Sequence, residues 1–219
     1  MFTGVTSLQT KALISCPNLV TLSLPSSCVI IGNTAICDCP ITSLDLSNVE
    51  KILVHGVTRV NIRSVYAPKL KSIGAGLFNQ CPELESIDDL GLITEIPGGL
   101  NYALMDFGNN PKLKKVNLPD SLIAIGAPVL GGCNSLEILK IGNSISSIGR
   151  LCCYINQGTT AVHLDVIIYA VTPPTISDFL FRRTDFFIYV PDESVTTYQE
   201  ATNWSAFSDR IKPLSEYSE

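Results

Sequence analysis

Leu118 to Ile141 reads LPDSLIAIGAPVLGGCNSLEILKI and spans one full period of a repeat. The Leu118 position recurs at Ile141, and Ile125 recurs after the same interval at Ile148. Sequences that resemble themselves at a fixed interval of about 20 to 50 residues form stacked repeat structures, in which each unit covers its neighbour. The chain is therefore predicted to be a solenoid.

The order of residue types within the period indicates a leucine-rich repeat. A Leu-x-Leu pair alternates as a half-buried strand requires, and the proline that follows it ends the strand. An Ile-Gly pair then places a branched side chain in the core and, we expect, a glycine with positive φ at the corner. We predict a leucine-rich-repeat solenoid, a β-rich right-handed coil of the α/β type, with about seven to eight coils of roughly 23 residues and a C-terminal helical cap.

Two segments depart from this pattern. The interval from Ile96 to Ile125 is longer than the period, and the extra length is an insertion near residues 100–109. Its large apolar side chains are Tyr102, Met105 and Phe107. We expect them to pack on the convex side, because leaving three apolar groups exposed is costly.

The second irregular segment, from Ile41 to Ile62, repeats a motif that is much shorter than the period. Its copies begin at Ile41, Val49 and Val57, and we interpret them as consecutive sides of a coil. The register between Ile62 and Ile73 stays open.

The chain has eight cysteines, and half of them occupy one position of the repeat, namely Cys16, Cys39, Cys81 and Cys133. Asparagine takes the same position at Asn110 and is expected to bond to backbone amides, while cysteine serves as a small buried apolar residue. Cys37 and the Cys152–Cys153 pair fall in neighbouring positions. We predict reduced, buried thiols, although a disulfide between stacked Cys16 and Cys39 is sterically conceivable. No zinc site is predicted, because a column with one cysteine per coil does not converge on a metal.

Composition excludes two kinds of partner. The formal net charge is −5 over 219 residues, so a nucleic-acid partner, which needs a clustered basic face, is not expected. The longest apolar run, Val166 to Val171, has the length of a strand and is far short of a membrane span. No membrane insertion is expected.

The two ends of the chain differ. We expect a solenoid over residues 1–190 and a C-terminal cap over 191–219, since the last coil of a solenoid must cover its core. The cap is predicted to contain a short helix with one apolar stripe that includes Trp204 as an anchor. At the other end the repeat is already under way between Leu8 and Cys16, so we expect the chain to be part of a longer protein.

The repeat, together with the Ile188–Pro191 strand end and the stripe Val195, Tyr198, Ala201, Trp204 and Phe207, resembles the BspA-like leucine-rich-repeat family of bacterial surface proteins. The resemblance covers nearly the whole chain, and the stretch from Cys39 to Cys81 departs from the pattern. It implies an exported protein, at the cell surface or secreted, and several members act as adhesins for host matrix proteins or other bacteria. It implies no shared catalytic residues and no cofactor.

The residues offer little support for catalysis. The two histidines, His55 and His163, are far apart in the sequence, and neither has a serine or cysteine partner in a recognisable motif. Asp88 and Asp89, with nearby glutamates, are interpreted as the solvated side of a strand and turn. A β-helix polysaccharide lyase remains a remote alternative, because such enzymes also have coils of about this length but need acidic metal ligands on one face.

A binding role is favoured instead. Outward side chains of the stacked strands should form a flat, preformed ribbon, here called the strand face, with successive strands about 4.8 Å apart. The candidate partner-binding residues on it are Ser23, Asp45, Asp88, Lys115, Asn117, Lys140 and His163. Acidic residues dominate its earlier strands and lysines its later ones, so we expect a charge-polarised face for an extracellular protein or glycan. The alternative is a passive spacer within a larger surface protein.

Overall fold

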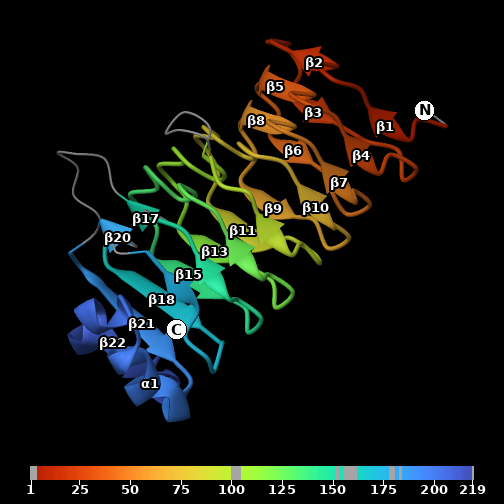
Figure 1. Cartoon of the computed structure of the whole chain (residues 1–219). Coiled ribbons are helices and arrows are strands. Elements are labelled where there is room, and N and C mark those ends of the chain that lie inside the picture. Colours follow the sequence, from red (N-terminus) through yellow and green to blue (C-terminus); the bar gives the residue numbers. More distant parts are fainter. Residues whose placement is uncertain are drawn as a thin grey trace.

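The chain winds along one axis as a parallel β-solenoid, as Figure 1 shows in this computed structural model. The structure describes residues 4–99, 105–150, 153–154, 162–177, 181–182 and 184–218. Every strand pair within these residues is parallel, and each strand pairs with its counterpart in the next coil. The predicted solenoid of leucine-rich repeats is confirmed.

Short strands build the three sides of each coil. The first side contains β1 (Ser7–Leu8), β4 (Ile30–Ile31), β7 (Lys51–Ile52) and β10 (Ser72–Ile73), followed by β12 (Glu95–Ile96), β14 (Ala124–Ile125), β16 (Ser147–Ile148) and β19 (Thr175–Ile176). The second contains β2 (Leu13–Ile14), β5 (Ile36–Cys39) and β8 (Val57–Val60), and also β17 (Cys153–Tyr154) with β20 (Phe181–Arg182). The third begins with β3 (Thr21–Leu22) and β6 (Ser43–Leu44).

The third side continues as the longest sheet of the described chain. Its strands are β9 (Ser64–Tyr66), β11 (Ser86–Asp89), β13 (Lys115–Asn117), β15 (Ile138–Ile141), β18 (Leu164–Ile168), β21 (Phe186–Val190) and β22 (Ile211–Pro213). The motif copies at Ile41, Val49 and Val57 contribute to β6, β7 and β8, so they do lie on consecutive sides of a coil. The open stretch between Ile62 and Ile73 contains β9 and β10.

The glycine of the Ile-Gly pair has a different role from the one expected. Positive φ occurs at other glycines, such as Gly76 and Gly132, and not at Gly32 or Gly149. A Cβ on Gly32 would lie 2.7 Å from the Leu8 carbonyl oxygen of the preceding coil, and one on Gly149 would lie 2.8 Å from the backbone of Gly126. Glycine is needed at this corner because neighbouring coils approach too closely for a side chain.

The cysteine and asparagine column lies in the core as predicted. Cys39, Cys81 and Cys133 are buried, Cys16 is half-buried, and all the cysteines whose side chains are described are free thiols. Asn110 is fully buried and accepts a hydrogen bond from the Cys81 amide at 2.7 Å. Its Nδ2 donates to the carbonyl oxygens of Phe78 and Phe107, each at 2.9 Å. Cys152 lies outside the described residues.

The insertion packs its apolar side chains inward. Met105 and Phe107 are buried, and the Phe107 ring stacks on Phe78 with 6.3 Å between centroids. Tyr102 lies outside the described residues. Between the two apolar residues the buried Asp106 carboxylate accepts hydrogen bonds from the amides of Leu77 and Gly98, each at 3.0 Å. The bond to Leu77 connects the insertion to the preceding coil, and the bond to Gly98 connects it to the segment that follows β12.

Burial raises the pKa of Asp106 to about 7, against the lowering effect of its backbone hydrogen bonds. Because the unfolded carboxyl releases its proton near pH 3.8, the free energy of unfolding should fall as pH rises from about 4 to about 7, by at most about 1.4 kcal/mol per pH unit. Asp106→Asn cannot ionise, so the variant should escape this loss. Urea unfolding of both proteins at about pH 4.5, 6 and 8 tests the linkage, and a stability difference that stays constant with pH contradicts it.

The last coils differ from the predicted register. Leu139 in β15 pairs with Val166 in β18, and not with Val162, where the regular period would place its partner. His163, expected opposite Lys140, therefore precedes the strand, and Ile167 takes that position. The reason is a longer connection between β16 and β18, which the repeat pattern does not reveal.

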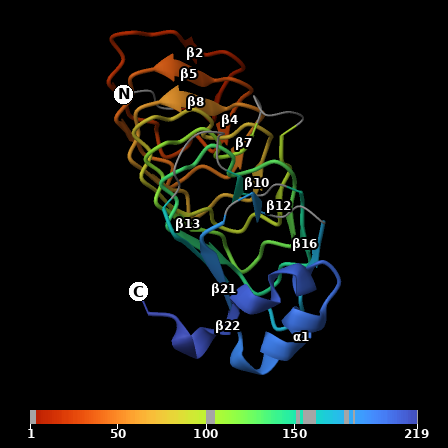
Figure 2. The same cartoon turned by 90° about the vertical axis from the view of Figure 1, so that its left-hand side faces the viewer.

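The cap closes the C-terminal end of the solenoid (Figure 2). It contains a 3-10 turn at Asp192–Ser194, helix α1 (Val195–Glu200) and a second 3-10 segment at Trp204–Arg210. Trp204 is buried and its Nε1 donates to the Pro174 carbonyl oxygen at 2.8 Å, while the Tyr198 hydroxyl donates to Ala170. The sequence did not reveal β22, which adds one more parallel strand to the long sheet. No helix within the described residues has the length and apolar character to cross a bilayer.

Candidate binding face

The strand face has a central column, with one outward residue from each coil. Strand pairing places Asn117, Lys140, Ile167, Tyr189 and Lys212 next to one another. Continuing the register of the neighbouring pairs extends the column back through Asp88, Tyr66, Asp45 and Ser23, although a bulge makes Asp89 the paired residue of Tyr66. Five of the predicted residues therefore share this column: Ser23, Asp45, Asp88, Asn117 and Lys140. Lys115 lies in the neighbouring outward column, between Ser86 and Ile138.

Tyr66 is the member of the column that the sequence did not identify. It is 58% exposed, on the side of β9 opposite the buried Val65. The pairing of β9 with β11 contains a bulge, so Asp88 and Asp89 both oppose the end of β9. The sequence does indicate a strand here, because Ser64-Val65-Tyr66 alternates between polar and apolar positions like the other strands. Its register could not be predicted, because the repeat is irregular in this coil.

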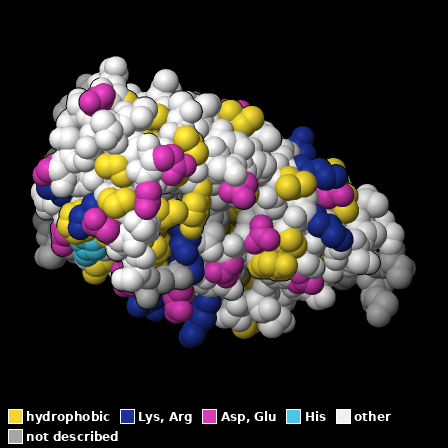
Figure 3. All heavy atoms as spheres, turned by 90° about the horizontal axis from the view of Figure 1, so that it is seen from below, with side chains coloured by type: hydrophobic (Ala, Val, Ile, Leu, Met, Phe, Trp, Pro, Cys, Tyr) yellow, Lys and Arg dark blue, Asp and Glu magenta, His cyan; other side chains and the backbone are white. Residues whose placement is uncertain are grey.

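Charges beside the strand face are largely paired between neighbouring coils. Lys112 Nζ lies 2.6 Å from Glu83, Lys71 lies 2.8 Å from Glu50, and Lys114 lies 3.9 Å from Glu137. In the view from below, acidic and basic side chains alternate along the molecule, with hydrophobic side chains exposed between them (Figure 3). The expected charge polarisation is therefore not seen in these flanking pairs.

Near the C-terminus the chain covers its own strand face. The Tyr217 ring lies 5.1 Å from Tyr189, centroid to centroid, and Lys140 Nζ lies 6.0 Å from the Tyr217 ring. As a result Ile167 is fully buried and Tyr189 is only 8% exposed, although both point outward from the sheet. The part of the central column that is open to a partner therefore lies mainly before β18.

His163 is engaged on both ring nitrogens. Nδ1 lies 2.6 Å from the Asp185 carboxylate and Nε2 lies 3.0 Å from that of Asp165. Burial lowers the pKa of His163, but the hydrogen bonds to Asp185 and Asp165 outweigh it, so the net shift is upward. Because both ring nitrogens contact carboxylates, the imidazole is held in place and neither nitrogen is free for proton transfer.

His55 belongs to another environment. Its ring lies against Gly76, and burial lowers its pKa. Within the described ranges no three histidine, cysteine, aspartate or glutamate side chains are placed to hold a metal ion.

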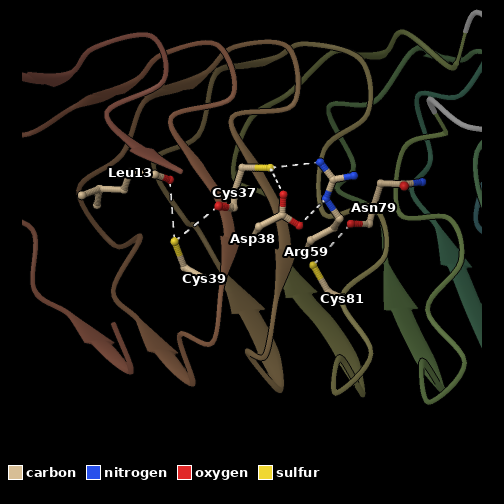
Figure 4. A network of polar contacts seen from close by, with 7 residues as sticks. All are labelled: Leu13, Cys37, Asp38, Cys39, Arg59, Asn79 and Cys81. Atoms are coloured by element: carbon tan, nitrogen blue, oxygen red, sulfur yellow. Dashed lines mark hydrogen bonds and ion pairs between the residues drawn. The ribbon is translucent and has the colours of Figure 1, made fainter. Parts of the chain in front are cut away.

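A polar network on the second side of the solenoid involves Cys37, as Figure 4 shows. Arg59 from β8 places Nη2 3.2 Å from the Cys37 sulfur and Nε 2.7 Å from the Asp38 carboxylate. The pKa of Arg59 is raised mainly by its hydrogen bond to Cys37 and also by the charge of Asp38. The thiols of Cys39 and Cys81 donate to the carbonyl oxygens of Cys37 and Asn79 in their own coils, and Cys39 also lies 3.7 Å from the Leu13 carbonyl oxygen of the preceding coil. The contacts of Arg59 join neighbouring coils.

Comparison with known families gives one result. The repeat family described as "BspA type Leucine rich repeat region" matches residues 1–100 and 105–184, in six copies. No curated protein matches the chain.

Proposed function

The chain belongs to the family of BspA-type leucine-rich-repeat regions, and from this we propose that it is a non-catalytic recognition module, at a cell surface or secreted, that binds an extracellular protein or glycan through the strand face. The observation that carries the proposal is the central column. Its open part presents tyrosine, carboxylate, amide and hydroxyl groups on a parallel sheet whose inward residues, such as Val65 and Ile87, are fully buried.

Such a surface suits recognition because it is rigid before the partner arrives. Association is less costly when the binding groups are already ordered, and here β11, β13 and β15 are each paired with a strand on both sides. Stacked strands place the side chains about 4.8 Å apart, a spacing that suits an extended partner lying along the solenoid axis.

The test is capture from an array of extracellular-matrix proteins and glycans, with two double variants. Asp88→Lys with Lys115→Glu exchanges charges on the strand face without changing the net charge. Glu95→Lys with Lys51→Glu makes the same exchange on the first side of the solenoid, where both residues are exposed. We expect the face variant to lose the captured partner and the control variant to keep it.

Two results contradict the proposal. If the face variant keeps its partner, binding occurs elsewhere on the molecule. If the unmodified chain captures nothing on the array, the spacer role is favoured. Circular dichroism of both variants distinguishes a lost contact from a lost fold.

A further inference from the structure

Three residues in the open part of the central column form what we call the acidic–tyrosine patch: Asp45, Tyr66 and Asp88. Ile36 pairs with Val57 and Lys51 with Ser72, so both strands of this coil are displaced by the same number of positions. Continuing this displacement along the coil brings Tyr66 level with Asp45 of the preceding coil. On its other side Tyr66 pairs with Asp89 of β11, and the exposed Asp88 is the bulged residue directly before Asp89. All three side chains are exposed.

The patch contains two carboxylates without a cation. Within the described residues, neither Asp45 nor Asp88 has an ion pair; Asp45 accepts a hydrogen bond from the Ser47 amide at 2.9 Å, and Asp88 accepts one from the Ser86 hydroxyl at 3.1 Å. Hydrogen bonds from Ser47 hold the pKa of Asp45 below its usual range, so it is ionised at neutral pH. The nearby lysines Lys71 and Lys112 are already paired with glutamates beside the face.

The other end of the same face contains an aromatic ring near carboxylates that already has a lysine over it. Lys212 Nζ lies 3.5 Å from the centroid of the Phe187 ring. His163 lies 5.2 Å from the same ring and contacts the carboxylates of Asp165 and Asp185. At this end of the sheet, the aromatic ring near carboxylates is therefore contacted by a cationic side chain of the chain itself. Tyr66 has the ring and the carboxylates, and the cation is left to a partner.

We propose that the acidic–tyrosine patch binds an arginine or lysine side chain from an extended basic segment of a partner protein. This deepens the function proposed above and rests on it, because it names the chemistry of the partner for the same face. The cation lies over the Tyr66 ring, which attracts it through its negative π face. Carboxylates on the neighbouring coils, each about 5 Å away along the sheet, supply the opposite charge.

The probe is a fluorescein-labelled peptide of six alternating arginine–glycine pairs, titrated with the full chain and followed by anisotropy. The same peptide with citrulline for arginine keeps the shape and removes the charge. We expect the arginine peptide to bind, the citrulline peptide to bind at least about tenfold more weakly, and added salt to weaken binding of the arginine peptide.

Matched variants locate the site. Tyr66→Ala should weaken binding about two- to fivefold, the usual range of an exposed cation–π contact, whereas Tyr66→Phe should keep the affinity. Asp45→Asn with Asp88→Asn should weaken it about fivefold or more and reduce the salt dependence. The controls are Tyr169→Ala, another exposed tyrosine, and Glu95→Gln with Glu200→Gln, which remove two exposed charges elsewhere. Both should stay within about twofold of the unmodified chain.

Several outcomes overturn the inference. It is wrong if the citrulline peptide binds equally well, or if the patch variants behave like their controls. It is also wrong if a neutral oligosaccharide binds, is lost in Tyr66→Ala and is unaffected by the asparagine substitutions, because the patch is then a sugar platform. If an array partner depends on Asp88 and Lys115 but the arginine peptide does not compete with it, the proposed function stands and only the ligand chemistry fails.

Discussion

Asn110→Ala is expected to lower the free energy of unfolding by about 3–5 kcal/mol, because the substitution removes three buried hydrogen bonds to backbone groups of neighbouring segments. The Asn110 side chain accepts from the Cys81 amide and donates to the carbonyl oxygens of Phe78 and Phe107. The residue is fully buried, so bulk water does not reach the backbone groups that lose their hydrogen bonds. Urea denaturation monitored by circular dichroism measures the loss.

The control for this prediction is Asn143→Ala, at an exposed corner of a neighbouring coil. That change should cost less than about 0.5 kcal/mol, the usual range for the surface. Asn110→Cys is a second comparison, because cysteine occupies the same position in other coils, as at Cys133, whose thiol donates to the Phe107 carbonyl oxygen at 3.1 Å. If Asn110→Ala and Asn143→Ala lower the free energy of unfolding by the same amount, the hydrogen bonds of Asn110 between coils do not stabilise the protein.

Trp204→Ala should destabilise the protein by about 3–5 kcal/mol through loss of buried aromatic area. Trp204 is 1% exposed, packs edge-on against Tyr198 with 5.0 Å between ring centroids, and donates to the Pro174 carbonyl oxygen. Because it joins the cap to the last coil, its loss should also increase amide hydrogen exchange in β18 and β21 before the earlier strands respond.

Trp204→Phe separates the two contributions of this residue. It retains most of the apolar contact and removes only the hydrogen bond to Pro174, so a loss of about 1–2 kcal/mol is expected. Equal losses in the phenylalanine and alanine variants would contradict the packing role. Hydrogen exchange that rises uniformly along the solenoid would contradict the assignment of Trp204 to the cap.

The sequence predicted features that depend on local periodicity. The interval of Leu118, Ile141 and their counterparts defines a solenoid because equivalent residues must stack, and the buried column of Cys39, Cys81 and Asn110 follows from that. The cap helix was also predictable, since its apolar residues recur every three positions.

Other features depend on contacts that periodicity does not encode. The longer coil before β18 moved His163 out of its expected position, because connection length varies without a sequence signal. Tyr66 was missed because it lies between Cys39 and Cys81, where the repeat is irregular and the register could not be read from the sequence. Asp106 carries no motif, and its role appears only when the amides of Leu77 and Gly98 converge on it. Strand β22 was hidden because Ile211–Pro213 is too short to show alternation.

The coils differ in length while the sheet they share remains regular. Ser86 pairs with Lys115, and Lys115 pairs with Ile138, so the first of these coils is clearly longer than the second, yet both pairs stay in register. Extra residues are therefore accommodated at corners without moving the outward columns. In evolutionary terms, the solenoid separates change of length from change of specificity. A coil can be lengthened, duplicated or exchanged as a unit. Each exchange alters the outward residues of one strand, while those of the neighbouring strands keep their positions.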